Sequence, residues 1–214
     1  MMFEEYVKDI NEKKILGVVE ALNKNNFDAR YFKSKEELFD AIKEMIPSGS
    51  TTAMGGTTTV KQIEGLTELI ESYDFKDRKA PANTKEEQRK VEMESTFVDY
   101  YFMSSNAITE DGKLYNVDGN GNRVAAMIYG PENVVIIATP NKIVKDMDAA
   151  IARNERIAAP INCARLDCKT PCAKVGHCMD CKTTDRICIF YTVTGFQRNK
   201  GRIKVFFINE ELGF

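Results

Sequence analysis

The stretch "NVVIIAT", Asn133 to Thr139, is the most strongly patterned segment of the sequence and decides its fold class. Its near-continuous apolar run predicts a strand buried on both faces, because a strand exposed on one face would alternate apolar and polar residues. Such strands are typical of parallel sheets that are covered by helices on each side. We therefore expect an α/β protein built around this strand.

Helical and strand-like patterns alternate on both sides of this stretch. Strands are expected at residues 27–32, 50–54, 99–103, 187–195 and 202–209, and helices at 4–25, 35–46, 57–70, 84–96 and 144–158, with Pro160 just beyond the last helix. Two helix starts carry a capping box, formed by Ser34 with Glu37 and by Thr84 with Glu87. The alternation predicts a three-layer α/β sandwich.

The composition is that of a globular protein, with 43% hydrophobic and 29% charged residues in 214, and we expect a single domain over residues 1–214. The net charge of −2 gives no reason to expect nucleic acid or an anionic membrane as a partner. The longest apolar runs are too short for a membrane span. The acidic N-terminus "MMFEEYVKDINEKK" lacks the apolar core of a secretory signal, so we expect a cytoplasmic protein.

The first candidate site is the stretch "MGGTTTVKQIEG", Met54 to Gly65. Gly55 and Gly56 follow a predicted strand and allow the backbone to approach a ligand closely, while Thr57, Thr58 and Thr59 add hydroxyl groups at a helix start. This pattern predicts a site for a phosphate or carboxylate, and thus for an anionic small molecule. The alternative is a tight turn in which threonine caps the helix.

The second candidate is the polar stretch "SSNAITEDGKLYNVDGNGNR", Ser104 to Arg123. Loops that follow the strands of an α/β sheet are where ligands bind. Glu110 is a candidate general base or nucleophile and Arg123 a candidate clamp for an anion, with Asn106 and Asn122 as polar ligands. The alternative is a long hairpin with turns stabilised by asparagine and aspartate.

The third candidate is the cysteine segment, residues 163–188, which holds all six cysteines with the spacing C-x4-C-x3-C-x5-C-x2-C-x6-C. In a reducing compartment such clusters more often indicate metal or redox chemistry than disulfides. Cys178 and Cys181 can bind one metal, with Cys172 and Cys188 completing four thiolate ligands for zinc or an iron–sulfur cluster. His177 is more typical of a bystander, and the alternative for the cluster is reduced thiols without a metal.

Long motifs resemble the LUD-domain (lactate utilisation) family. They are "MGGTTTVKQIEGL", "SSNAITEDGKLYNVDGNGNRVAAMIYGP", "NKIVKDMDAAIARNERIAAP", "TPCAKVGHCMDCKTTDRIC" and "GRIKVFFINEELGF". The resemblance implies a Rossmann-like fold similar to sugar-phosphate isomerases and CoA transferases. It also implies a link to bacterial oxidation of lactate or related organic acids, beside iron–sulfur partner subunits. This chain departs from a plain accessory LUD protein in carrying its own cysteine segment.

Three functions follow from these features. We favour a redox or electron-transfer accessory protein of organic-acid utilisation, with Cys172, Cys178, Cys181 and Cys188 holding a 4Fe–4S cluster rather than zinc; Cys163 and Cys168 are then spares. The first alternative is an acyl- or CoA-transferase-like enzyme, or an ATP-using ligase, with Glu110 in the active site; the turn "TEDG" resembles the glutamate turn of some CoA transferases. The second is a small-molecule-binding module stapled by zinc. We also expect both polar stretches to face one cleft.

Overall fold

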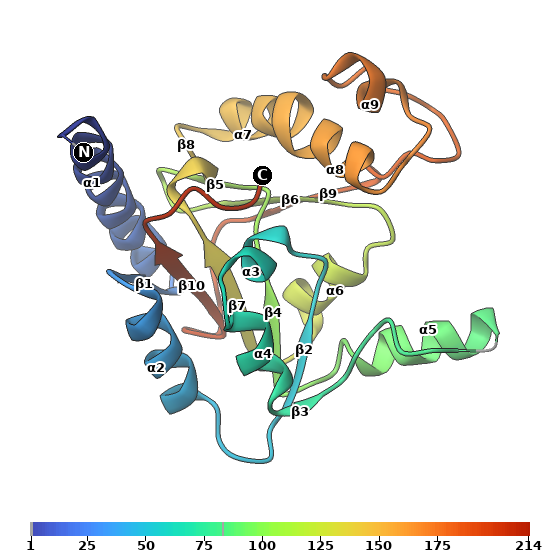
Figure 1. The fold of residues 1–214 in the computed structure, drawn as a ribbon, viewed down its shortest axis with the longest axis horizontal. Helices are drawn as coiled ribbons and strands as arrows, with labels where there is room; N and C mark the ends of the chain where they lie inside the picture. The colour runs from blue at the N-terminus through green and yellow to red at the C-terminus, as the bar shows by residue number, and fades with distance from the viewer. Residues whose placement is uncertain (1, 83) are drawn as a thin grey trace.

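A parallel six-stranded sheet forms the centre of the molecule (Figure 1). The computed structural model describes residues 2–82 and 84–214. The strand order is β1 (Asp28–Phe32), β10 (Ile203–Ile208), β7 (Asn133–Ala138), β4 (Tyr100–Met103), β2 (Thr51–Met54) and β3 (Asp74–Phe75), and every neighbouring pair is parallel. The predicted α/β class is therefore confirmed.

Strand β7 contributes to two hydrophobic cores, one on each face of the sheet. Val134, Ile136 and Ala138 belong to one core, whereas Val135 and Ile137 belong to the other. This division follows from strand geometry, because successive side chains point to opposite faces. The apolar run is unbroken because both faces of β7 are buried, each in a different hydrophobic core.

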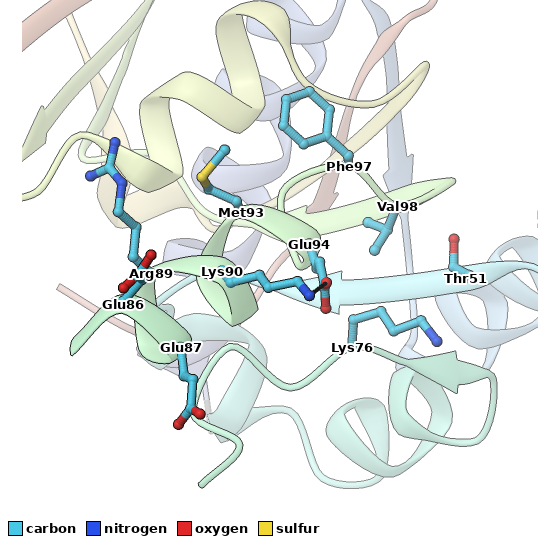
Figure 2. A pocket seen from close by; sticks show the side chains of 10 residues that line it. All are labelled: Thr51, Lys76, Glu86, Glu87, Arg89, Lys90, Met93, Glu94, Phe97 and Val98. Atoms are coloured by element: carbon cyan, nitrogen blue, oxygen red, sulfur yellow. Dashed lines mark ion pairs between the residues drawn. The ribbon is translucent and has the colours of Figure 1, made fainter. Parts of the chain in front are cut away.

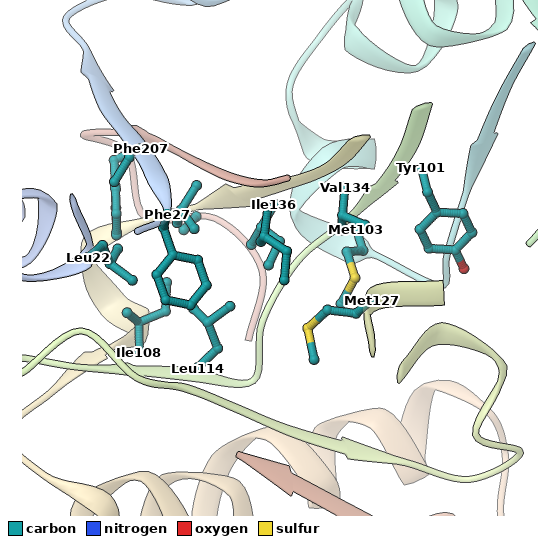
Figure 3. Packing of buried hydrophobic residues seen from close by; sticks show 14 of the residues in the cluster. Leu22, Phe27, Tyr101, Met103, Ile108, Leu114, Met127, Val134, Ile136 and Phe207 are labelled. Atoms are coloured by element: carbon teal, nitrogen blue, oxygen red, sulfur yellow. The ribbon is translucent and has the colours of Figure 1, made fainter. Parts of the chain in front are cut away.

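The two cores separate three layers. On one face, the helices α2 (Lys35–Met45), α3 (Thr58–Gln62) and α4 (Leu66–Glu71) contribute residues such as Leu38, Val60 and Ile70. On the other face, α1 (Met2–Lys24) and α6 (Asn122–Tyr129) pack against the sheet. Figure 3 shows this second core, with Leu22 and Phe27 beside Phe207 and Ile136. The arrangement is a Rossmann-like three-layer sandwich.

A second, smaller sheet lies against the α1 face. It was not predicted as a sheet, although a strand was expected at residues 187–195 and a hairpin was the alternative for residues 104–123. Its order is β8 (Ile143–Val144), β5 (Ala107–Thr109), β6 (Leu114–Asp118) and β9 (Phe190–Thr194). Ile108 and Leu114 turn inward to the core, whereas Ala107, Tyr115 and Val117 pack on the other side against Ala150 of α7 (Met147–Arg153). The stretch from Ser104 to Arg123 is therefore the hairpin β5–β6 followed by α6.

The predicted helix at residues 57–70 is wrong as a single helix, because it divides into α3 and α4. Gly65, just before α4, adopts a left-handed conformation with φ of 85°. A Cβ added at Gly65 would also lie only 3.2 Å from the ring of Phe39. Glycine takes this conformation without steric cost, so the chain turns here instead of continuing the helix.

The predicted helix at residues 144–158 is longer than expected. It begins as α7, passes through a π-helical turn, η2 (Asn154–Ala158), and continues as α8 (Ala159–Arg165). Pro160, expected beyond the helix, lies in the first turn of α8. Proline lacks the N–H donor of a regular turn, and the wider π turn before it avoids the clash that proline would cause.

The remaining elements are α5 (Lys85–Glu94), the short 3₁₀ turn η1 (Pro140–Lys142) and α9 (Pro171–Val175). Of the two predicted capping boxes, Thr84 and Glu87 make a full one. At the other helix start the Ser34 side chain accepts from the Glu37 N–H, but the Glu37 carboxylate accepts from the N–H of Lys33 instead of Ser34. Within residues 2–82 and 84–214, no helix has both the length and the apolar character needed to cross a bilayer.

Candidate functional site

A cleft of about 300 Å³ lies at the carboxyl ends of the central strands. The segments that follow β2, β4 and β7 all reach it, with Thr57 after β2, Ser104 after β4 and Lys142 after β7. Carboxyl ends of parallel strands meet at one edge of a sheet, and this edge is where α/β proteins bind ligands. The position of the cleft therefore follows from the fold.

The structure brings together seven of the nine residues that the sequence marked in the two polar stretches. They line the cleft and are Gly56, Thr57, Thr58, Thr59, Asn106, Asn122 and Arg123. The two stretches, far apart in the sequence, thus face one cleft. That these residues bind a ligand stays a prediction.

Gly55 lies behind the cleft wall. A Cβ at this position would be 2.9 Å from the Tyr101 hydroxyl and 3.2 Å from Cγ of Arg123. The close backbone approach expected of this glycine is therefore made to two buried side chains of the protein. Gly56 is exposed in the cleft, and an added Cβ there would be 3.4 Å from a guanidinium nitrogen of Arg78.

Arg123 joins the loops that form the cleft. Its guanidinium donates to four acceptors, which are the Ser104 carbonyl, Asn116 Oδ1, Asn106 Oδ1 and the Val117 carbonyl. Its Nε lies 3.6 Å from Oδ2 of Asp118, and both side chains are only 12% exposed. Because these protein acceptors use the guanidinium donors, Arg123 fixes the shape of the cleft and has little free capacity to clamp an anion.

Glu110 does not share the cleft with Arg123. It is an exposed residue in the turn between β5 and β6, and its backbone N–H donates to Val144 O. Strand β5 separates it from Asn106, and four residues of extended chain span roughly 13 Å. The same turn is held against the end of α1 by Asn25, whose amide donates to the Asp111 and Gly112 carbonyls. The expectation of a single pocket containing both Glu110 and Arg123 is therefore corrected.

Three basic side chains in the cleft were not marked from the sequence: Arg78, Lys142 and Arg165. Lys142 could have been found, since it follows the carboxyl end of β7 as the marked stretches follow β2 and β4. Arg78 precedes α5 and Arg165 ends α8, and neither stands in a motif that signals a site. Among the described residues that line the cleft, Asp118 is the only carboxylate side chain, and it is paired with Arg123.

Burial controls the electrostatics of the cleft floor. Lys142 is only 2% exposed, and burial, together with the charges of Arg153 and Arg123, lowers its pKa from 10.5 to about 7. Burial also lowers the pKa of Arg153 to about 10. Arg153 is held by the carbonyls of Asn141 and Asn106, to which it donates at 2.8 and 2.5 Å. A positive potential at this edge of the sheet suits an anionic ligand.

The four predicted metal ligands lie in one neighbourhood around Cys188. Burial first, and then the nearby thiols of Cys178 and Cys172, raise the pKa of Cys188 to about 11, and Cys181 adds to this effect. In the part of the chain that is described, however, no group of three or more histidine, cysteine or acidic side chains is arranged to hold a metal ion. The four thiols are therefore of the right chemical type to bind a metal. To coordinate one, they would have to move closer together than they are in this structure.

Other contacts connect the cysteine segment to itself and to the cleft. Arg186 donates to the carbonyls of Cys181 and Cys188 and to Asp180, which organises the loop that follows α9. Ile187, next to Cys188, lines the cleft, as does Asn162, next to Cys163. The thiols and the cationic cleft are thus adjacent.

Cys163 and His177 differ in their surroundings. Cys163, treated above as a spare, is 1% exposed; burial raises its pKa to about 12, and its thiol contacts Thr170 and Cys172. His177 is exposed, and its Nδ1 lies 3.3 Å from the Val175 carbonyl. Cys163 is therefore a neighbour of one predicted ligand rather than an isolated thiol.

A larger hollow of about 950 Å³ runs along α5 (Figure 2). Its charged side chains are mixed in sign, and Lys90 and Glu94 form an ion pair with 4.0 Å between Nζ and Oε1. Met93 and Phe97 are exposed at its rim, with 52% and 66% of their surface accessible. None of the described polar residues that line the hollow is buried, so we assign the candidate site to the smaller cleft.

Fold and cleft together define an α/β domain with a cleft lined by basic side chains at the carboxyl edge of a parallel sheet. The family model of the LUD domain matches residues 16–208, and the chain belongs to this family. Among solved structures, a DUF162 family protein from Deinococcus radiodurans is similar in fold, with a TM-score of 0.52 and 10% sequence identity over 94% of this chain and 98% of the other. A comparison with curated proteins found no match.

Proposed function

We propose that this protein binds a small organic anion in the cleft and serves organic-acid utilisation of the lactate type. The observation that supports this most is the convergence of Arg78, Lys142 and Arg165 on one cleft whose single carboxylate side chain, among the described residues, is already paired. Hydroxyl groups of Thr57 and Thr58 complete a lining that suits a carboxylate. Membership of the LUD family supports the link to lactate-type acids.

Calorimetric titration with L-lactate, pyruvate and inorganic phosphate at low ionic strength tests this proposal. We expect a carboxylate to bind with a Kd below about 1 mM. Arg165→Met should weaken binding at least about tenfold, because it removes a cation from the lining. Arg156→Met, an exposed arginine of η2 outside the cleft, is the matched control and should bind as the parent does. Equal affinities of the parent and Arg165→Met would contradict the proposal.

We further propose a redox or electron-transfer accessory role, with Cys172, Cys178, Cys181 and Cys188 as ligands of a 4Fe–4S cluster and with iron–sulfur subunits as partners. The electrostatic coupling of Cys188 to the other three thiols supports this ligand set. When bound, the cluster would supply one-electron chemistry beside the cleft. The chain's own contribution is Arg186, which donates to the carbonyls of both Cys181 and Cys188 and so connects the two parts of the loop that carry them.

Iron, sulfide and zinc analysis of anaerobically purified protein tests the metal proposal. About four iron and four sulfide per chain would support the cluster. One zinc per chain without sulfide would instead favour the zinc-stapled binding module, with the same ligands and no electron transfer. The transferase- or ligase-like alternative depends on Glu110. Because Glu110 lies outside the cleft, the geometry supports this alternative least.

A further inference from the structure

A segment of this chain, residues 212–214, already lies in the cleft. It belongs to the motif "GRIKVFFINEELGF", to which the functions proposed above give no role. Phe214 lines the cleft together with Thr59 and Lys142. Those two side chains are only 1% and 2% exposed although they belong to the lining. We call residues 212–214 the strap.

Three side chains hold the first part of the strap. Thr139 and Asn141, which follow β7, donate to the Leu212 carbonyl at 2.9 and 3.3 Å. Gln62 of α3 accepts a hydrogen bond from the Gly213 N–H at 2.6 Å. The side chain of Leu212 also packs against the core on the α2 face. Leu212 is therefore the anchor of the strap.

The second part of the strap takes contacts that a ligand could use. Nζ of Lys142 donates to the main-chain oxygen of Phe214 at 2.8 Å. Gly213 packs so closely that an added Cβ would overlap Oγ1 of Thr59 and lie 3.3 Å from Nζ of Lys142. An amine and a hydroxyl are groups that bind a carboxylate. The strap therefore occupies a place that an oxygen of an anionic ligand could take.

The contacts of the strap allow it to open. Each hydrogen bond contributes little net free energy, because water replaces the lost partner when the strap opens. Ordering the three residues also costs conformational entropy. Segments held by a few such contacts open locally while the rest of the protein stays folded.

We propose that the strap closes the inner part of the cleft when no ligand is bound and that the organic anion displaces it. An oxygen of the anion then replaces the Phe214 oxygen at Lys142, and the Thr59 hydroxyl becomes accessible to the ligand. The affinity of the cleft depends on the fraction of molecules in which the strap is open. This inference rests on the proposed binding of an organic anion in the cleft.

Gly213→Val tests the proposal, because it opens the strap and leaves the side chains of the lining unchanged. The new side chain would overlap Thr59, and the φ of 67° at this position disfavours any residue with a Cβ. We expect calorimetry to show pyruvate binding at least about tenfold more tightly than to the parent, which corresponds to a strap closed about nine-tenths of the time. Gly49→Val is the matched control and should bind as the parent does. Gly49 has a similar φ of 83° but lies in open space in the turn before β2.

Hydrogen–deuterium exchange of the parent follows the strap directly. The peptide that carries residues 212–214 should exchange faster in saturating pyruvate than without it, whereas β7 should keep its protection. Gln62→Ala removes the partner of the Gly213 N–H from outside the cleft lining and should tighten pyruvate binding by a smaller factor. If Gly213→Val does not fold, Gln62→Ala and the exchange measurement decide.

The outcomes separate the strap from the proposed function. Tighter binding to Gly213→Val, with faster exchange of the strap in the liganded parent, supports both. Equal affinities of the parent and the strap variants overturn the strap and leave the anion site standing. Weaker binding to Gly213→Val, or slower exchange of the strap in pyruvate, also overturns it, since residues 212–214 would then be part of the ligand site. Absence of binding to the parent and to both strap variants overturns the proposed function as well.

Discussion

The cleft and the cysteine segment lie side by side but are ordered by different means. The cleft is built on the ends of buried strands, and its residues are fixed by direct contacts such as those of Arg123 with Asn106 and Asn116. The loop at residues 176–189, by contrast, has no regular helix or strand and few buried side chains. Burial of apolar surface can order the first region, whereas the second needs another source of free energy. In our account a metal supplies it.

The largest effect is expected when a metal ligand is removed. Cys178→Ser should abolish the metal content of anaerobically purified protein and increase proteolysis within residues 176–189, because the loop then loses what orders it. Metal analysis and limited proteolysis are the measurements. Cys163→Ser is the control, and it should retain the metal; if it empties the site as completely as Cys178→Ser, the ligand set is wrong.

The second effect concerns the residue that holds the cleft together. Arg123→Met removes the cationic partner of Asp118, which keeps only the hydrogen bond from the Val124 N–H. It also removes the donor to Asn116 Oδ1 and to the Val117 carbonyl. We expect a loss of about 3 kcal/mol in the free energy of unfolding, or roughly 6–12 °C in melting temperature. Thermal unfolding measures this. An unchanged melting temperature would show that the cleft does not depend on Arg123 for its shape.

The third effect is a pH dependence of the free energy of unfolding that arises from Lys142 in the cleft. Because the pKa of Lys142 is lowered from 10.5 to about 7 by burial and by Arg153 and Arg123, the unfolded chain binds more protons at this group between those values. The free energy of unfolding should therefore rise as the pH increases from 7 to 9, by on the order of 2 kcal/mol.

Urea denaturation at the two pH values, for the parent and for Lys142→Met, isolates this contribution. The variant should lack the part of the rise that Lys142 causes. Parallel pH profiles of the two proteins would mean that Lys142 stays protonated in the folded state.

The smallest effect is expected at Glu110. It is exposed in the β5–β6 turn and lies outside the cleft, so Glu110→Gln should change the free energy of unfolding by less than about 0.5 kcal/mol. Pyruvate affinity by calorimetry should equal that of the parent. A loss of affinity with an unchanged melting temperature would restore the transferase-like alternative.

The sequence predicted the fold well where periodicity carries the information. The apolar run of β7 identified the parallel sheet because both faces of that strand are buried. The hairpin β5–β6 was missed as part of a sheet because its strands are short and sit among turn residues, and its partner β9 comes more than seventy residues later. Strand pairing at such separation leaves no local pattern.

The candidate site was predicted in part for the same reason. Thr57 and Asn106 stand in polar stretches after strands, so their place at the carboxyl edge could be inferred. Arg78 and Arg165 reach the cleft only through the path of the folded chain. The role of Arg123 could not be read from the sequence either, since its acceptors are mostly backbone and amide groups that become neighbours on folding.

Hydrogen–deuterium exchange of anaerobically reconstituted and metal-free protein tests the central comparison most directly. Our account predicts slow exchange in β7, β4 and α6 in both samples, because folding alone orders the cleft. Residues 176–189 should exchange fast without metal and become protected when it binds. Equal protection of this loop in both samples, or loss of protection in β7 and β4 on metal removal, would contradict the account.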